Sequence, residues 1–360
     1  MKAVVVEAGR IAALVDNHPR PAITADEVLV QVRAAGQNPT DWKHVKFLAA
    51  PGTVVGCDYA GEVVEMGANV TSLKIGDRIA GCVHGADSAS YGSFAEFTPV
   101  NPKLAFRVPT AMSDEEAGVF GVSASTAAVA LFQHLSLHTP DAPYAGWEVR
   151  GSQSPEEHTA PLRDDADAPK LLVWGASSSA GFFAIQLAKL AGIRTVATAS
   201  PDSHAMLKSL GAEAVFDYRD PEAGAKILAW AGGELVNGLD CISEDSTVPL
   251  ASNAMTGGTL VLLLSGSVQH KDNNPKVALK PMLLYTAMGK AFTKFGQTFP
   301  ASPVDYEWGC KWNELCSRLV AENKLRAPKL KITGGLESFQ IGFDLLEQKK
   351  VRAEKVVMKW

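Results

Sequence analysis

The chain has 360 residues, of which 46% are hydrophobic and 20% are charged, a composition typical of a folded globular protein. A net charge of −5 without a block of basic residues argues against a nucleic-acid binder. No apolar stretch reaches the length of about 18 residues that a membrane-spanning helix needs, so we expect no membrane partner.

The N-terminal sequence and the cysteines indicate in which cellular compartment the protein is expected. The N-terminal sequence MKAVVVEAGR has the charged Glu7 where a secretory signal would have its apolar core, so we expect no secretory signal. The five cysteines are scattered and form no C-x-x-C pair, a pattern that favours reduced thiols. We therefore expect a cytoplasmic protein.

The first hundred residues predict a β-rich domain. Val28–Val32 alternates in hydrophobicity, while Gly61–Val64 and Ile79–Val83 are short apolar runs. Gly, Pro and Asp separate these runs at the close spacing of a barrel or a sandwich.

Helix is expected from Ser113, because Ser113 and Glu116 form a capping-box pattern before small and apolar residues that continue to Leu135. Residues 138–169 are then rich in Pro, Asp, Ser and Gly and lack hydrophobic periodicity. We expect them to form a long surface insertion.

From Leu171 onward, apolar runs and amphipathic segments alternate, which predicts a doubly wound α/β sheet. The expected strands are Leu171–Trp174, Thr195–Ala199, Ala214–Asp217, Gly238–Ile242 and Thr259–Leu264. The expected helices between them are Phe182–Leu190, Ser203–Leu210, Ala223–Trp230 and Val248–Ala254. After residue 299, we expect a helix at Trp308–Glu322, a strand near Lys329–Thr333, a helix near Phe339–Lys349 and a strand at Lys355–Met358.

The segment from Leu171 to Ser200 has the order of a nucleotide-binding unit: strand, small-residue turn, helix, strand. The turn at 175–181 contains only Gly, Ala and Ser, which lets the backbone approach a pyrophosphate at the helix N-terminus. Ser177 and Ala180 stand where the strict G-x-G-x-x-G fingerprint has its second and third glycines. A tight connection without a ligand is the open alternative.

The residue after the second strand concerns the choice of cofactor. NAD-preferring sites have an Asp or Glu there, which binds the ribose 2′-hydroxyl, but this chain has Ser200. Ser203, Lys208, Tyr218 and then Arg219 follow, and hydroxyls with a cation suit a 2′-phosphate. NADPH is therefore expected over NADH, with Lys208 as a solvated helix residue being the alternative.

Seven segments carry a resemblance to a known superfamily. They are NPTDWK (38–43), GCDYAGEVVEMGANV (56–70), KIGDRIAG (74–81), YGSFAEF (91–97), SAST (123–126), WGASSSAG (174–181) and KSLGAEAVFDY (208–218). In this order they resemble the medium-chain dehydrogenase/reductase superfamily over nearly the full length. The resemblance implies an α/β protein with a GroES-like β-rich catalytic domain at 1–124, a Rossmann domain at 125–298 that contains the insertion, and a C-terminal return at 299–360.

The resemblance also bears on metal binding. Alcohol dehydrogenases of this superfamily hold a catalytic zinc with a Cys and a His-Glu pair, and those places resemble Asn38 and Cys57-Asp58 here. The four-cysteine lobe for a structural zinc is also missing, so a zinc-free member with no metal site is implied. Asp58 is then expected to be structural and to bind nearby backbone amides.

Zinc-free members resemble quinone oxidoreductases and enoyl reductases. The NPTDWK and CDYAG spellings, the polar insertion and the serine-rich turn are similar to the fungal trans-acting enoyl reductases that serve polyketide synthases. Trp42 and the sequence from Ser265 to Pro303 depart from that pattern. Because of these departures, the resemblance does not identify the substrate.

An enoyl reductase moves a hydride to the β-carbon of an α,β-unsaturated carbonyl, so it needs a donor for the enolate oxygen and a proton for the α-carbon. By the resemblance, Lys43 is the leading candidate for this donor. Thr126 and Asn38 are implied to contact the nicotinamide or the substrate. The alternatives are a surface lysine at 43, a Thr126 that bonds only its own backbone, and an Asn38 that only caps a turn.

The other expected site residues follow from the nucleotide-binding unit and from the resemblance. The expected cofactor-binding residues are Pro39, Thr40, Asp41, Trp42, Ser177, Ser178, Ser179, Ala180, Ser200, Pro201, Asp202, Ser203, Lys208, Tyr218, Leu263, Leu264, Ser265, Val351 and Arg352. The expected substrate residues are Thr126, Ala127, Tyr285, Met288 and Phe292. The last three belong to a stretch, 282–295, that suits an acyl tunnel or, as the simpler alternative, the core.

The residues after the second strand favour NADPH, and the resemblance implies a zinc-independent enoyl reductase that acts in trans with a polyketide synthase on an unsaturated, carrier-bound acyl chain. The resemblance implies a monomer, and the net charge argues against a nucleic-acid partner. Two alternatives stay open: a free-standing quinone or enone oxidoreductase, and an NADPH-binding scaffold that has lost catalysis.

Overall fold

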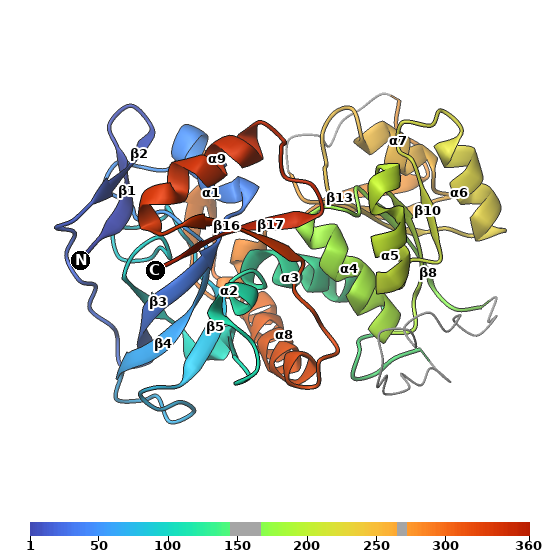
Figure 1. The fold of residues 1–360 in the computed structure, drawn as a ribbon. Helices are drawn as coiled ribbons and strands as arrows, with labels where there is room; N and C mark the ends of the chain where they lie inside the picture. The colour runs from blue at the N-terminus through green and yellow to red at the C-terminus, as the bar shows by residue number, and fades with distance from the viewer. Residues whose placement is uncertain (145–166, 265–271) are drawn as a thin grey trace. The chain divides into compact units, whose positions relative to one another are not determined.

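The computed structural model describes residues 1–144, 167–264 and 272–360, and the chain forms two compact units (Figure 1). The first unit consists of residues 1–125 and 284–360, and the second of residues 126–283. Residues 284–298, which we expected in the nucleotide-binding domain, belong to the first unit. The reason is aromatic packing, because Tyr285 and Phe292 both contact the His84 ring there.

The main sheet of the first unit has seven strands in the order β16-β17-β3-β4-β5-β7, with β6 paired to β3. The pair β16–β17 is parallel and the other pairs are antiparallel. The bounds are β3 Val28–Gly36, β4 Asp58–Met66, β5 Arg78–Cys82, β6 Phe97–Val100, β7 Ala105–Arg107, β16 Lys329–Gly334 and β17 Glu354–Lys359. Two hairpins add β1 Ala3–Glu7 with β2 Ile11–Val15, and β14 Phe292–Lys294 with β15 Gln297–Phe299.

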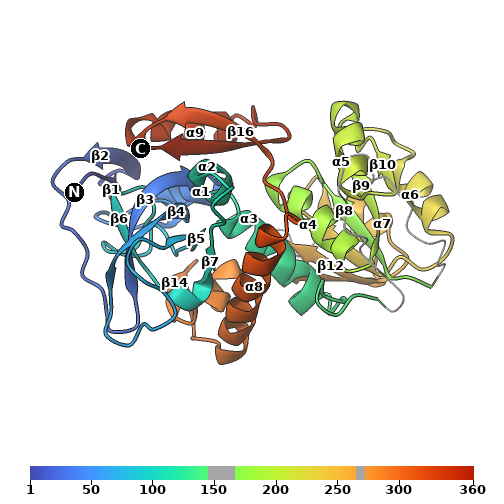
Figure 2. The same ribbon diagram turned by 60° about the horizontal axis from the view of Figure 1, so that its bottom comes forward.

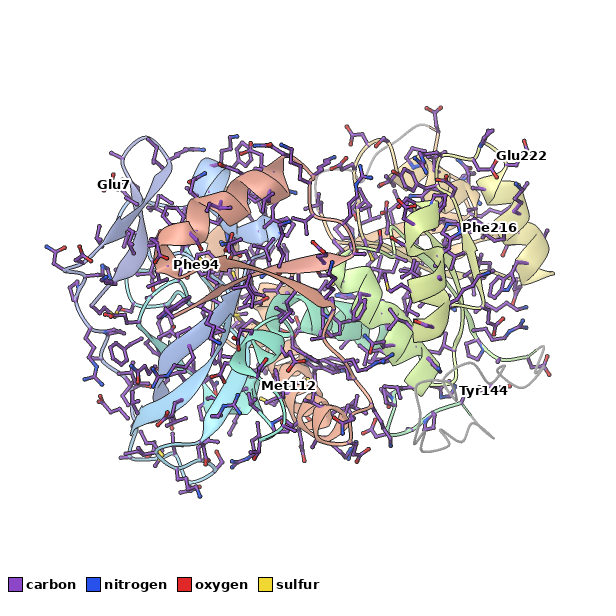
Figure 3. The ribbon with its side chains drawn as sticks, in the orientation of Figure 1. Glu7, Phe94, Met112, Tyr144, Phe216 and Glu222 are labelled. Atoms are coloured by element: carbon purple, nitrogen blue, oxygen red, sulfur yellow. The ribbon has the colours of Figure 1, made fainter. Side chains whose placement is uncertain are left out.

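Helices surround this sheet. They are α1 Pro39–Lys43 with a following π-helix His44–Leu48, α2 Asp114–Ala117, α8 Pro303–Ala321 and α9 Phe339–Glu347, and α3 Gly121–Ala128 leads into the second unit. Short 3₁₀ turns cover Pro102–Leu104, Leu284–Met288 and Leu336–Ser338. Helix α9 lies along β16 and β17 (Figures 1 and 2). Its Phe343 ring packs 6.2 Å from the fully buried Phe94, which Figure 3 labels.

The predicted capping box is confirmed at the start of α2. The Ser113 hydroxyl accepts the Glu116 backbone N–H at 3.2 Å, and the Glu116 carboxylate accepts the Ser113 N–H at 3.0 Å. The expected continuous helix from Ser113 to Leu135 is instead divided. Gly118 ends α2, α3 follows, and a π-helix at Val129–His134 closes the segment.

The sheet of the second unit has six parallel strands in the order β10-β9-β8-β11-β12-β13, which confirms the doubly wound prediction. The bounds are β8 Lys170–Trp174, β9 Arg194–Thr198, β10 Ala214–Phe216, β11 Asn237–Asp240, β12 Gly258–Leu262 and β13 Val277–Pro281. Strand β13 was not predicted. The strand order reverses between β8 and β11, and ligands of such sheets bind beyond the carboxyl ends of the strands at this point.

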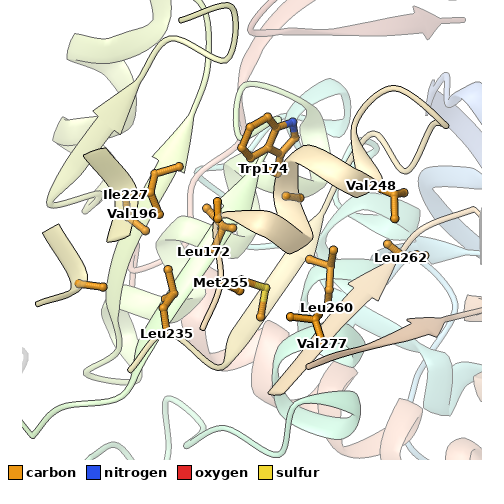
Figure 4. Packing of buried hydrophobic residues seen from close by; sticks show 13 residues of the cluster. Leu172, Trp174, Val196, Ile227, Leu235, Val248, Met255, Leu260, Leu262 and Val277 are labelled. Carbon is orange, nitrogen blue, oxygen red and sulfur yellow. The ribbon is translucent and has the colours of Figure 1, made fainter. Parts of the chain in front are cut away.

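Side-chain alternation along β8 places helices on both faces of this sheet. Leu172 and Trp174 face one hydrophobic cluster, which includes Ile227 of α6 and Val248 of α7 (Figure 4). Because successive side chains of a strand point to opposite faces, Leu171 and Val173 face the other side, where α4 packs on β8. The helix bounds are α4 Ser179–Leu190, α5 His204–Leu210, α6 Ala223–Ala231 and α7 Val248–Asn253, with a 3₁₀ turn at Pro201–Ser203.

Residues 145–166 of the expected surface insertion lie outside the described residues. The described flank before them is tied to the second unit, because the Tyr144 N–H donates to the Ala191 carbonyl at 3.0 Å. Across the described parts of the chain, no helix is both long enough and apolar enough to cross a membrane.

Candidate active site

The turn after β8 packs closely against its neighbours and leads directly into α4. Gly175 has φ +72°, and a Cβ there would lie 2.5 Å from Ile242 Cγ1. Its N–H donates to the Thr198 hydroxyl at 3.0 Å, which ties the turn to β9. Ser178 caps α4, since its Oγ accepts the Gly181 N–H at 3.2 Å. The turn therefore presents the N-terminus of a 12-residue helix at the carboxyl edge of the sheet.

Gly181 allows α4 to pack closely against the turn after β8. A Cβ on Gly181 would lie 2.6 Å from Ala176 Cα and 2.7 Å from its carbonyl oxygen. Ser177, Ser179 and Ala180 are half-buried in the same turn. Gly181 ends the expected small-residue turn, but it was not among the expected cofactor-binding residues.

Further expected cofactor residues follow the carboxyl ends of the neighbouring strands. Ser200 follows β9, Tyr218 follows β10, and Leu263 and Leu264 follow β12. The Leu263 N–H donates to the Ser243 hydroxyl at 2.8 Å, and Ser243 stands in the turn after β11. Ser265, the remaining expected residue of this group, lies outside the described residues.

A fully buried carboxylate organises the turn after β11. Asp240 accepts the N–H groups of Ile242 and Ser243, each at 2.9 Å, and the Thr247 hydroxyl at 2.7 Å. Burial raises the pKa of Asp240 above its ordinary value. Sequence analysis did not single out this residue, which fixes the turn that holds Leu263.

Of the first two cations that follow Ser200 in the sequence, Arg219 has an ion-pair partner and Lys208 has none in the described residues. Arg219 is paired with Asp217, with Nη2–Oδ2 at 2.8 Å, and this bond lowers the pKa of Asp217. Asp202, in the turn Pro201–Ser203, also interacts electrostatically with Arg219. Lys208 is exposed on α5 and makes no ion pair within the described parts of the chain. The Ser200 hydroxyl does not cap the turn that it precedes.

In the first unit, the NPTDWK segment folds as α1. Asn38 precedes the helix, only 2% exposed, and its N–H donates to Asp41 Oδ2 at 2.7 Å. Pro39 occupies the first turn, where its missing N–H costs nothing. Lys43 ends the helix half-buried, with its ammonium 5.7 Å from the Trp42 ring centroid.

A buried cation that sequence analysis missed lies beside this segment. Lys355 of β17 is 2% exposed, and its Nζ donates to Asn38 Oδ1 and to Ser123 Oγ and lies 3.4 Å from Asp58 Oδ2. The expected structural role of Asp58 is confirmed, because its Oδ1 accepts the Val122 N–H at 2.5 Å. The available signal was a lysine at the start of an apolar run near the C-terminus.

This arrangement does not suit a metal ion. The Asn38 amide oxygen already accepts from the Lys355 ammonium, which lies between Asn38 and Asp58. Burial raises the pKa of the Cys57 thiol well above its ordinary value, so the thiolate that a metal needs is disfavoured. Residues 1–144, 167–264 and 272–360 contain no group of three His, Cys, Asp or Glu side chains placed to hold a metal.

The structure brings one expected substrate residue to α1. The Tyr285 hydroxyl lies 2.9 Å from Thr40 Oγ1 and 3.7 Å from Cys57 Sγ. The Tyr285 ring stacks on His84 at 3.8 Å, and the Phe292 ring meets His84 edge-on at 5.1 Å. Tyr285 and Phe292 are buried, as the core alternative requires, whereas Met288 is half-buried.

The remaining expected residues lie on α3 and near the C-terminus. Thr126 is half-buried on α3, and Ala127 next to it is fully buried. The preceding Ser125 accepts the Trp312 indole N–H at 2.9 Å. Val351 and Arg352 stand in the turn between α9 and β17 of the first unit.

Asp41 gives a prediction for pH dependence. Burial raises its pKa from an ordinary 3.8 to about 7, despite the bond from the Asn38 N–H. A raised folded-state pKa means that the native protein binds this proton more tightly than the unfolded chain does. The resulting stability is fully present below pH 3.8 and is lost as the pH rises through about 7.

We expect Asp41→Asn to remove this loss, because the amide oxygen still accepts the Asn38 N–H and carries no charge. Between pH 5 and 7 the free energy of unfolding of the wild type should fall by about 2–3 kcal/mol relative to the variant. Denaturant titrations at both pH values measure it. Asp16→Asn, whose side chain is 83% exposed, is the control. An equal wild-type–variant difference at both pH values would contradict the assignment.

Comparisons with known proteins agree with this architecture. Residues 24–110 match the alcohol dehydrogenase GroES-like domain, and residues 180–295 match the zinc-binding dehydrogenase family. A putative zinc-dependent alcohol dehydrogenase from Rhizobium etli has a solved structure that is 26% identical with a TM-score of 0.77, covering 100% of this chain and 98% of that one. The expected fold, a GroES-like domain with a Rossmann domain, is confirmed.

Full-length relatives narrow the family. Trans-enoyl reductase resD of Aspergillus sclerotiorum is 34% identical, covering 100% of both chains. Trans-enoyl reductase caaB of Aspergillus niger is 33% identical, covering 99% of this chain and 96% of its own length. The chain therefore belongs to the trans-enoyl reductase family of the medium-chain dehydrogenase/reductase superfamily and is an oxidoreductase that acts on carbon–carbon double bonds.

Proposed function

We propose that the protein is an NADPH-dependent, zinc-independent enoyl reductase that acts in trans with a polyketide synthase. Its substrate is the α,β-unsaturated thioester of an acyl chain that the synthase carries. The relatives named trans-enoyl reductases support the reaction and the mode of action. One observation carries the choice of NADPH: Ser200, and not an acid, follows β9. We further propose a cytoplasmic monomer.

The carboxyl edge of the Rossmann sheet supplies groups that fit a dinucleotide. The turn at 175–181 offers backbone amides at the start of α4 for the pyrophosphate. Ser200 and Lys208 suit the 2′-phosphate, since Arg219 is already paired with Asp217. Leu263 and Leu264 would flank the nicotinamide, which supplies the hydride when bound.

Lys43, Thr126 and Asn38 are the proposed catalytic residues. When hydride reaches the β-carbon, negative charge develops on the carbonyl oxygen, and a fixed cationic donor lowers the barrier. The Lys43 ammonium would hold this oxygen by a hydrogen bond. Asn38 and Thr126 would hold the reacting groups in place.

The test is an assay of the purified protein with crotonyl thioesters and with small quinones, with NADPH or NADH as donor. We expect NADPH to be consumed with the thioester and the saturated thioester to appear in the mass spectrum. Rapid turnover of quinones but not of thioesters would identify a quinone oxidoreductase. NADPH binding without any turnover would identify a scaffold. Turnover that is equal with NADH would refute the cofactor choice.

Ser200→Asp gives a sharper test of the cofactor. A carboxylate at this position should repel the 2′-phosphate, so we expect kcat/KM for NADPH to fall at least about tenfold, or 1.4 kcal/mol, with NADH unaffected or improved. Steady-state kinetics with both cofactors measure it. Ser209→Asp, which adds the same charge at an exposed position of α5, is the control. Equal losses for both cofactors would show that Ser200 does not discriminate between them.

A further inference from the structure

Lys355 joins segments that lie far apart in the sequence. Its Nζ donates to Asn38 Oδ1, 317 residues away, and to Ser123 Oγ at 3.1 Å, 232 residues away. It also lies 3.4 Å from Asp58 Oδ2. Its partners precede or belong to three elements, α1, α3 and β4, while Lys355 itself belongs to β17.

The two helices that Lys355 connects carry the proposed catalytic groups. Asn38 precedes α1, which ends at Lys43. Asp58 binds the Val122 N–H in the first turn of α3, and Thr126 lies one turn after Ser123 on the same helix. A displacement of the Lys355 ammonium would therefore release the starts of both helices together.

Two glycines provide the space that this group of residues needs. A Cβ on Gly36 would lie 3.1 Å from Asp58 Oδ2 and 3.2 Å from Lys355 Cε, and it would meet the Gly118 carbonyl at 2.6 Å. A Cβ on Gly121 would lie 2.5 Å from Asp58 Oδ1. The backbone thus closes tightly around the ion pair, which fixes the position of the ammonium.

Stability alone is a weak reason for such a pair. Lys355 and Asp58 are 2% and 0% exposed, so both lose their hydration, and an apolar pair of similar volume often gives equal or greater stability. We propose that Lys355 is a positioning residue for the reduction, which holds α1 through Asn38 and α3 through Asp58 in the arrangement that catalysis requires. This inference rests on the proposed function, because it takes Lys43 and Thr126 as the groups to be positioned.

A double-variant cycle separates positioning from stability. Lys355→Met and Asp58→Asn each leave one buried charge unpaired, so each single variant should lower the thermal midpoint. The double variant removes both charges, while the amide oxygen introduced at position 58 can still accept the Val122 N–H. We expect its thermal midpoint to return near that of the wild type, but its kcat to stay at least about tenfold lower with little change in the KM for NADPH.

Lys359→Met is the matched control, because Lys359 lies on the same strand with a 59% exposed side chain. It should keep the wild-type kcat. A double variant that recovers both stability and kcat would show that the pair is only structural and would overturn the proposal. So would a folded Lys355→Met variant with full activity.

A second measurement keeps this test apart from that of the proposed function. Amide hydrogen exchange should become faster at residues 39–43 and 121–126 in the double variant and stay unchanged in α8. If the wild type reduces only quinones, the proposed function fails, and the kcat comparison with a quinone still tests Lys355. If the wild type has no activity, exchange rates that are unchanged in the double variant would overturn the positioning role.

Discussion

Replacement of Lys43 by methionine is expected to lower kcat for reduction of an enoyl thioester by about 10²–10⁴-fold, with little change in the affinity for NADPH. The reason is that the developing negative charge on the carbonyl oxygen would lose its cationic donor, whereas the proposed phosphate-binding groups at 175–181 and at Ser200 would be unchanged. Lys43 ends α1, and Asn38 at the other end of this helix is fixed by Lys355. Single-turnover kinetics, with a fluorescence titration of NADPH, measure both quantities.

Lys46→Met is the matched control for this substitution. The Lys46 ammonium lies 5.7 Å from the Trp42 ring centroid, the same distance as that of Lys43, and it forms an ion pair with Glu347 of α9. Its removal should change kcat little. A folded Lys43→Met protein with full activity would remove the proposed role of this lysine, and equal losses in both variants would indicate a general effect of the charge near Trp42.

The nucleotide-binding unit was predictable because its signals are local. An apolar strand, a small-residue turn and an amphipathic helix lie within 30 consecutive residues, and β8, α4 and β9 are found within a few residues of the predicted ranges. Strand β13 was not predictable in the same way. Its sequence VALKP contains a lysine and a proline, and proline is tolerated at the edge of a sheet, where β13 lies.

The contacts around the proposed catalytic segment have no local signal. Lys355 meets Asn38 across 317 residues, and Tyr285 meets Thr40 across 245 residues. A lysine before an apolar strand has the same appearance whether its ammonium turns outward or inward. Asp58 was correctly predicted to bind a backbone amide, but nothing near it in the sequence indicates the cation that balances its charge.

Gly181→Ala is expected to raise the Kd for NADPH at least about tenfold, which corresponds to 1.4 kcal/mol, and to lower the free energy of unfolding by about 1–3 kcal/mol. The three atoms nearest to the added Cβ would be backbone atoms of Ala176, at 2.6–2.8 Å, and backbone atoms cannot rotate away to make room as a flexible side chain can. The turn itself must shift, and with it the bond from the Gly181 N–H to Ser178 that caps α4. Fluorescence titration and denaturant unfolding measure the two effects.

Gly224→Ala is the matched control, because Gly224 lies in a helix of the same unit and its added Cβ would meet only Ala254 Cβ at an ordinary 3.9 Å. Helical Gly→Ala changes of this kind stabilise by about 0.4–1 kcal/mol, mainly by restricting the unfolded chain. The Kd should be unchanged. If Gly181→Ala bound NADPH as tightly as Gly224→Ala, the turn after β8 would not be what holds the pyrophosphate. The nucleotide site would then have to be sought elsewhere along the carboxyl edge of the sheet.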